Sequence, residues 1–293
     1  MSIADEIKLT FKSGSSLVKL IYINLAIFVI VNIVEIFYFF LNRHDSYSAF
    51  LLTFAVPADL HLLIRKPWTV ITYMFLHKNF LHILFNLLWL YWFGKIFLEY
   101  LDGKRLVGVY LLGGLSGAFL YILTYNLFPV FFSQLKMSYA LGASAAVMAI
   151  VISIATYVPQ YSVYLLFFGR VKIIYIAIIG FLVTSVFDFS INTGGKIAHI
   201  GGALFGYLFT LQYRRGRDIT KGLNQFLGAV FGLFKPRLKV NVSYRKAETD
   251  YDFNRRKKDE QGEIDRILDK IAKSGYESLT KEEKDLLFRQ SKS

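Results

Sequence analysis

Several near-continuous apolar stretches between residues 17 and 213 constrain the fold of this chain more than any other feature. Each is close to the roughly 20 residues with which an α-helix crosses a bilayer core. A soluble core of this length would instead alternate apolar and polar faces. Since 55% of the residues are hydrophobic and the mean hydropathy is +0.43, the sequence predicts an all-α, polytopic membrane protein.

Six of these stretches are predicted transmembrane helices, with boundaries good to about four residues. They cover residues 18–40, 79–98, 106–128, 139–157, 171–187 and 197–213. The first is too long for the core of a signal peptide and lacks a clear cleavage site, so we interpret it as a retained span. The chain contains no cysteine, which excludes disulfides, thiolate catalysis and cysteine-metal sites.

Basic residues gather near the span ends that would share one side of the membrane. They flank the first span and follow the second, fourth and sixth: Lys8, Lys12, Lys19, Lys95, Lys104, Arg105, Arg170, Lys172, Arg214, Arg215 and Arg217. The loops on the other side carry fewer: Arg43, Arg65, Lys66, Lys136 and Lys196. Because positive charge marks the cytoplasmic side, both termini are predicted to be cytoplasmic.

Polar side chains occur in three of the predicted spans, where they are costly and therefore indicate function. His82 and Asn86 lie in the first two turns of the second span, Ser144 about five residues into the fourth, and His199 near the start of the sixth. In this topology all four fall within roughly 12 Å of the outer surface. A serine and a histidine at one depth, with donors nearby, predict a serine hydrolase.

Each of these residues also has a structural interpretation. A serine in a membrane helix commonly bonds to a carbonyl one turn earlier or joins two helices. Gly202 and Gly206 form a GxxxG pair that favours close helix packing, which would also bring Ser144 to His199. His82 and Asn86 share one helix face, and alone they fit a packing hydrogen bond or the edge of an ion path. Their combination favours catalysis.

At these motifs the sequence resembles the rhomboid family of intramembrane serine proteases. The resemblance runs from Lys66 to about Tyr213. It rests on Pro67-Trp68-Thr69, Thr72, Phe75-Leu76-His77, His82-Ile-Leu-Phe-Asn86, Gly94, Glu99, Gly103, Gly113 to Gly117, Gly142-Ala-Ser144 and Ala198-His199-Ile-Gly201-Gly202. The order of these motifs makes the resemblance specific, and it implies a six-helix rhomboid-like bundle of the bacterial type in the inner membrane.

The resemblance implies a dyad in which Ser144 is the nucleophile and His199 the general base, without a third carboxylate. The Ser144 N–H and the side chains of His82 and Asn86 would form the oxyanion hole, and Gly142 would let the backbone approach the substrate. Substrates would be transmembrane segments of other proteins, and no metal or cofactor is implied. The competing interpretation is a catalytically silent relative that binds or escorts membrane clients.

Two positions depart from the family pattern. Ala145 stands where the family often has glycine. Met148 stands where many members carry an aromatic that stacks on the base imidazole; a thioether contacts a ring edge but orients it less well. Asp188 could orient His199 or simply end a helix in solvent.

Glu35, in the first span, matches no position in the family. It could bond to a neighbouring helix, face the interface or belong to an ion path. A solute transporter would rest on Glu35 and His82, but it usually has repeated halves, and the sequence shows no internal repeat.

Two connections are predicted to control access to the site. Residues 41–70 are unusually apolar for a loop and are expected to lie in the membrane interface. Residues 188–196, which include Gly194 and Gly195, are expected to form a flexible cap beside His199, as a gate or as an ordinary connection.

The chain is therefore divided into a short polar N-terminus (1–16), a membrane domain (17–213), a basic amphipathic segment (214–239) and a tail (240–293). Residues 214–293 contain 20 Lys or Arg and 13 Asp or Glu, so they carry +7 of the net +13. Apolar residues at helical spacing between 219 and 234 predict an interfacial helix, with a seventh span as the alternative. Lys235, Arg237 and Lys239 would then contact anionic lipid.

No aromatic or recognition motif supports binding of nucleic acid by this positive charge. Residues 240–262 are predicted to be a charged linker, followed by a small helical hairpin. Its first helix would stop at Gly275, and Thr280 with Glu283 would cap the second. The sequence leaves the oligomeric state open.

Overall fold

The computed structural model describes residues 5, 9–11, 13–187, 189–190, 192–233 and 249–290. Several residues to which the sequence assigned a role lie outside this set: Lys8, Lys12, Asp188, Phe234, Lys235, Arg237 and Lys239. The chain forms two compact units, residues 1–235 and 236–293, which we describe separately.

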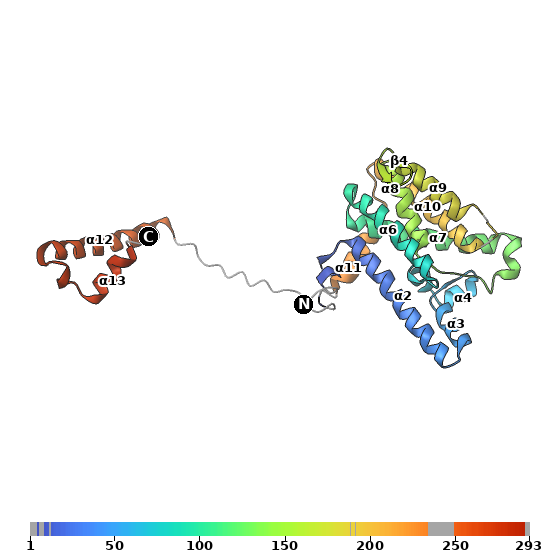
Figure 1. Ribbon diagram of the computed structural model, residues 1–293, viewed down its shortest axis with the longest axis horizontal. Helices are drawn as coiled ribbons and strands as arrows, with labels where there is room; N and C mark the ends of the chain where they lie inside the picture. The colour runs from blue at the N-terminus through green and yellow to red at the C-terminus, as the bar shows by residue number, and fades with distance from the viewer. Residues whose placement is uncertain are drawn as a thin grey trace. The chain divides into compact units, whose positions relative to one another are not determined.

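The first unit is a helical bundle with one helix for each predicted span (Figure 1). The six helices are α2 (Ser16–Phe40), α6 (Phe80–Tyr100), α7 (Gly103–Leu127), α8 (Ser144–Tyr157), α9 (Ile173–Ser185) and α10 (Thr193–Arg214). α2, α6 and α7 are long and apolar enough to cross a membrane, whereas α8 and α9 are apolar but shorter. The predicted all-α membrane fold is confirmed.

Helix α8 lies at the centre of the bundle, and ten of its 14 residues are buried. Glycines let α10 pack directly on its backbone: a Cβ at Gly202 would collide with the carbonyl oxygen of Ala145, and one at Gly206 with that of Ala149. Small residues permit such close approach of helices in membranes. Because Gly202 is one turn from His199, this contact holds the histidine near the first turn of α8.

The segment between α2 and α6 is more ordered than the predicted apolar loop. It contains α3 (His44–Leu52), β1 (Val56–Pro57), α4 (Leu60–Arg65), α5 (Thr69–Thr72) and the 3-10 helix η1 (Tyr73–Phe75). Asp59 caps α4 by accepting the His61 N–H at 2.7 Å. Strand β1 pairs antiparallel with β2 (Tyr139–Ala140), so that Val56 lies opposite Ala140.

The fourth span differs from its prediction in a way that affects the site. Residues 139–140 are extended because they pair with β1, and α8 begins at Ser144 rather than at 139. Ser144 is therefore the first residue of its helix, not the fifth or sixth. A 14-residue helix is about 21 Å long, shorter than the ~30 Å hydrocarbon core.

The predicted flexible cap is also corrected. Helix α10 begins at Thr193, so Gly194 and Gly195 belong to its first turn. A Cβ on Gly194 would lie 2.8 Å from the ring of Tyr121 in α7. Gly194 therefore allows tight packing against α7, whereas a Cβ on Gly195 would meet the side chain of Asn192 just before the helix. Both glycines lie in a helical turn and not in a loop.

Three further elements complete the first unit. The 3-10 helix η2 (Pro129–Gln134) follows α7, and a hairpin of β3 (Ser162–Leu165) and β4 (Gly169–Lys172) joins α8 to α9. Helix α11 (Lys221–Leu233) packs against α7, where a Cβ on Gly108 would lie 2.6 Å from Thr220 Cβ. Its placement in the membrane interface stays a prediction.

The second unit consists of α12 (Asp250–Ser274), the 3-10 helix η3 (Tyr276–Ser278) and α13 (Lys281–Gln290). The predicted linker is wrong from residue 250 onward, because α12 starts there with Thr249 as its cap. The helix ends at Gly275, whose φ is 77°. Thr280 and Glu283 form the predicted reciprocal cap, with N–H bonds of 2.7 and 3.3 Å.

Candidate active site

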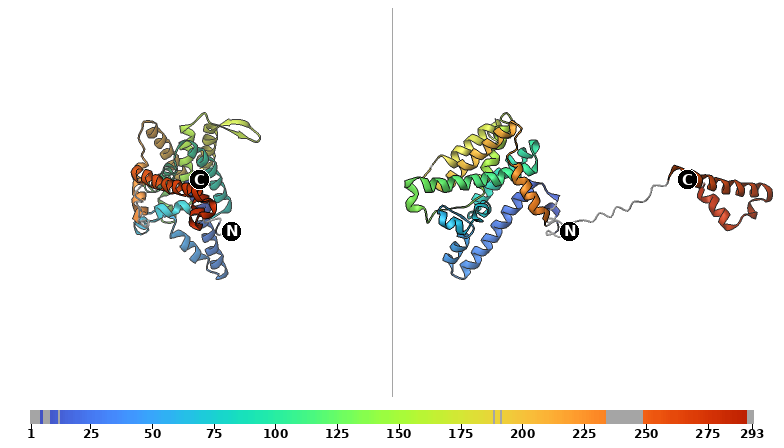
Figure 2. Two further views of the ribbon diagram at one scale, coloured as in Figure 1. Left: turned by 90° about the vertical axis from the view of Figure 1, so that its left-hand side faces the viewer. Right: turned by 180° about the vertical axis from the view of Figure 1, so that it is seen from behind.

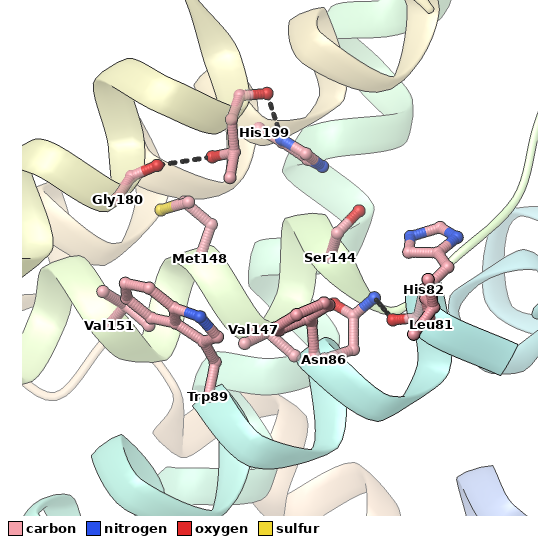
Figure 3. A pocket seen from close by; sticks show the side chains of 12 residues that line it. Leu81, His82, Asn86, Trp89, Ser144, Val147, Met148, Val151, Gly180 and His199 are labelled. Atoms are coloured by element: carbon pink, nitrogen blue, oxygen red, sulfur yellow. Dashed lines mark hydrogen bonds between the residues drawn. The ribbon is translucent and has the colours of Figure 1, made fainter.

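The four polar residues predicted to form the site line one cavity of about 250 Å³. Ser144 comes from α8, His199 from α10, and His82 and Asn86 from α6. Figure 3 shows the Ser144 hydroxyl between the ring of His199 and that of His82. Three helices far apart in the sequence thus place a serine hydroxyl, two imidazoles and an amide around one space.

The turn before α8 explains how Ser144 is presented. Gly142 has a φ of 129°, a conformation that favours glycine, and a Cβ there would lie 2.9 Å from Cε1 of His82. Its N–H donates to the carbonyl of Tyr73 at 2.9 Å. Because Ser144 starts the helix, its own N–H has no acceptor within the helix and lies at the positive end of the helix dipole.

The imidazole of His199 is oriented by a backbone carbonyl. Its Nδ1 lies 3.2 Å from the carbonyl oxygen of Thr184. Since a carbonyl can only accept, Nδ1 carries the proton and Nε2 keeps the lone pair that a general base needs. Met148 also lines the cavity, in place of the aromatic expected from the family.

The Thr184 carbonyl is available because α9 ends there. The last carbonyls of a helix have no partner within it, and the N–H groups of both Val186 and Phe187 donate to Leu182 instead. The Thr184 hydroxyl is occupied separately, since it donates to the Gly180 carbonyl at 2.8 Å. Sequence reasoning missed this contact, because any residue type could supply the carbonyl.

Not all of the hydrogen bonds that a serine-histidine dyad and its oxyanion hole would use are made. The Ser144 hydroxyl has no hydrogen-bond partner within the described part of the chain. Asn86 donates its Nδ2 to the carbonyl of His82, at 2.8 Å within α6. Such bonds are often long or misaligned without substrate and tighten when it binds.

A third histidine supports the site from behind, and the sequence gave it no role of its own. His77 is fully buried, and its Nε2 accepts the Ala143 N–H at 3.3 Å. Its Nδ1 lies 3.3 Å from the Phe75 carbonyl, and its ring meets that of His82 edge-on at 5.2 Å. Burial, helped by His82, lowers the pKa of His77 to about 4, so the neutral ring remains an acceptor near pH 7.

Glu35, which the sequence left unassigned, lies away from this cavity. It accepts a hydrogen bond from the Tyr47 hydroxyl at 3.1 Å, which joins α2 to α3. Within the described residues, no three His, Cys, Asp or Glu side chains are grouped as a metal site would require.

Comparison with known proteins gives two family matches. The model of the rhomboid domain matches residues 65–216, just over half of the chain and all four cavity residues. A family of unknown function, DUF6576, matches residues 247–293. RHOMBOID-like protein 12, mitochondrial, from Arabidopsis thaliana is 30% identical over 159 residues, 51% of this chain and 47% of that protein. The chain therefore spans about half the length of this curated relative.

Proposed function

The chain belongs to the rhomboid family, and from this premise we propose that it is an intramembrane serine endopeptidase. Its substrates would be transmembrane segments of other membrane proteins, cut within or beside the span. The observation that carries the proposal is the single cavity shared by Ser144, His199, His82 and Asn86, with His199 held by the Thr184 carbonyl in the tautomer of a base.

In the acylation step, the Ser144 Oγ attacks the scissile carbonyl while His199 Nε2 takes its proton. The resulting imidazolium is stabilised by its Nδ1–H bond to the Thr184 carbonyl. This carbonyl takes the place of the carboxylate that orients the histidine in a Ser-His-Asp triad. His199 then gives the proton to the leaving amine. Water, activated by the same nitrogen, hydrolyses the acyl-enzyme.

The oxyanion of the tetrahedral intermediate would be bound by three donors: the Ser144 N–H and the side chains of His82 and Asn86. Loss of one such donor typically costs about 2.7–4 kcal/mol of transition-state stabilisation. For Asn86 to take part, its amide must leave the His82 carbonyl. We expect substrate entry into the cavity to drive this exchange.

The chemistry needs no cofactor or metal. Because a protease cannot reach a carbonyl in an intact helix, we expect substrates with Gly, Ser, Ala or Pro near the cut. We further propose a bacterial plasma membrane with both termini in the cytoplasm, on the basis of the basic residues near the span ends. Basic residues after α10 would contact anionic lipid.

One alternative has an observation in its favour. The Ser144 hydroxyl is not bonded to His199, and Met148 replaces an aromatic that would stack on the base. A catalytically silent protein that binds or escorts membrane clients would tolerate both features. It predicts client binding without turnover.

The deciding experiment is cleavage of a single-span substrate in proteoliposomes by the wild type, Ser144→Ala and His199→Ala. Ser153→Ala, on the same helix but bonded to Thr210, is the matched control and should cut. A fluorophosphonate probe should label the wild type and Ser153→Ala, but not Ser144→Ala. Folded wild-type protein that neither cuts nor reacts with the probe would favour the silent alternative.

A further inference from the structure

The turn of the β3–β4 hairpin consists of large apolar residues. Strand register pairs Leu165 with Gly169, which leaves Leu166, Phe167 and Phe168 as a three-residue loop. Tight turns are normally made from Gly, Pro, Asn, Asp or Ser. Here only Gly169, with a φ of 68°, follows that rule.

These loop side chains are almost entirely exposed. The exposed fractions are 88% for Leu166, 86% for Phe167 and 79% for Phe168. Exposed apolar clusters mark sites of contact with proteins or membranes. An isolated two-stranded hairpin is also only marginally stable in water, so this tip requires an apolar environment from outside the chain.

The base of the hairpin lies at a level typical of the membrane-water interface. Tyr161 and Tyr157 both pack edge-on against Tyr100 at the end of α6, at 6.1 and 6.5 Å. Tyr157 also contacts Tyr213 at the end of α10. Tyrosines gather where one end of the ring is apolar and the other is wet, so this cluster is what the edge of a bilayer favours.

From this level the hairpin extends sideways from the helices (Figure 2, left view, yellow-green). It does not pack closely against α6, because a cavity of about 570 Å³ separates them, lined by Trp92, Val163 and Leu165 among others. At the base of the hairpin Val163 packs against the core of the bundle, whereas the exposed Arg170 and Lys172 lie on the opposite face of the ribbon, which is open to the surroundings.

The charges on the hairpin fit an anionic surface. Arg170 lies opposite Tyr164 and Lys172 opposite Ser162, so both cations share one face of the ribbon, and both are exposed. Basic residues next to an apolar wedge bind anionic headgroups while the wedge enters the acyl region.

We propose that the β3–β4 hairpin is a lipid-binding element whose tip of Leu166, Phe167 and Phe168 inserts into the membrane leaflet beside α6. Arg170 and Lys172 bind the phosphates of anionic phospholipids, and acyl chains fill the cavity behind the strands. Since β4 leads directly into α9, and the Ile173 N–H donates to the Tyr161 carbonyl at 2.7 Å, this contact also fixes the start of α9. The proposal is independent of catalysis.

The absence of cysteine from the chain permits a direct test. The full-length Phe167→Cys variant, labelled with an environment-sensitive fluorophore, is reconstituted into phosphatidylcholine vesicles with and without phosphatidylglycerol. Lys257→Cys on the exposed face of α12 is the aqueous control. We expect blue-shifted emission at 167, quenching by spin-labelled lipid and protection from iodide.

Arg170→Glu combined with Lys172→Glu should weaken the lipid quenching specifically in vesicles with phosphatidylglycerol; no change would refute the headgroup contact. Iodide access to position 167 equal to that at 257, without lipid quenching, would overturn the insertion. Iodide protection without lipid quenching, increasing with the number of chains per vesicle, would also overturn it and assign the tip to a second copy.

Discussion

At the scale of single residues, the candidate site brings Ser144 and His199 to one cavity, and the imidazole of His199 contacts a carbonyl at the end of a helix. That Ser144, His199, His82 and Asn86 lie together could be predicted from the sequence, because each is a polar residue in an otherwise apolar span; their catalytic roles stay a prediction. The Thr184 carbonyl could not be predicted, since a backbone group leaves no residue signature. The contact of this carbonyl with Nδ1 orients the imidazole of His199, in place of the stacking aromatic for which Met148 is substituted. The Thr184 hydroxyl donates to Gly180 instead.

Replacing Thr184 by valine tests this distinction. Valine keeps the β-branched shape and the carbonyl, and removes only the hydroxyl that donates to Gly180. Bonds of this back-donating kind contribute little to helix stability, so we expect the cleavage rate to stay within about threefold of wild type. A loss comparable to that of His199→Ala would show that the hydroxyl, and not the carbonyl, positions the base.

Gly142 should be intolerant of any side chain. Alanine there must adopt an unfavourable positive φ and must displace His82, whose Cε1 would lie 2.9 Å from the new Cβ. We expect roughly a 10²-fold loss of fluorophosphonate reactivity, as for removal of one oxyanion donor. Gly222→Ala is the matched control, since no atom lies within 4 Å of a Cβ there; equal behaviour of the two variants would contradict the argument.

The buried His77 makes a prediction about pH. Its folded pKa of about 4 is below the unfolded value of about 6.5. Because the unfolded state then binds more protons between these values, stability should decrease as pH falls from about 6.5 to 4, by an amount on the order of 3 kcal/mol. His77→Gln keeps an acceptor for the Ala143 N–H but does not titrate.

Thermal unfolding in detergent between pH 4 and 7.5 measures the effect. The curve of His77→Gln should be flatter than that of the wild type across this window, with similar stability at pH 7.5. If the stability of both proteins changes with pH in the same way, the pKa of His77 does not differ between the folded and unfolded states.

At the scale of elements, six helices could be predicted because an apolar run of some 20 residues has few other solutions. The ends of those helices could not. Residues 139–143 are apolar enough to extend α8, but β2 forms because β1, about 80 residues earlier in the chain, supplies its partner. That long-range pairing places Ser144 at a helix start, where its N–H has no acceptor within the helix and, in the proposed mechanism, would bind the oxyanion.

The contact between α8 and α10 should be the most sensitive packing in the bundle. Gly202→Ala places a methyl group against the Ala145 carbonyl, which is backbone and cannot rotate away. We expect α10 to be displaced, with loss of both activity and a large part of the stability. Leu204→Ala, on the same helix but half exposed, should be nearly neutral in a thermal unfolding assay. Equal destabilisation by Gly202→Ala and Leu204→Ala would show that α10 packs less tightly on α8 than the structure indicates.

At the scale of the whole molecule, the candidate site is built from one of the two units alone. All four site residues belong to the first unit, whereas the second has contacts of its own: Lys270 is paired with Glu283 at 2.9 Å, and Ile267 and Leu279 are buried. The sequence predicted a helical hairpin there but ended the linker too late. A run of charged residues such as the one after 250 fits an exposed helix as well as a linker. The sequence signal that distinguishes the helix is Thr249, whose side chain caps its first turn.

Deletion of residues 240–293 should therefore leave intrinsic proteolysis nearly unchanged. The truncated chain keeps α2 to α11, including Thr220 against Gly108 and the ion pair of Arg105 with Asp218 at 2.8 Å, so the bundle should fold with the same cavity. Cleavage in proteoliposomes should stay within about threefold of the full chain, and Ser144→Ala in the truncated chain should abolish it. Complete loss of cleavage in a truncated protein that still reacts with the fluorophosphonate probe would instead assign the second unit to substrate capture, because the nucleophile would be intact while turnover of a membrane protein required the tail.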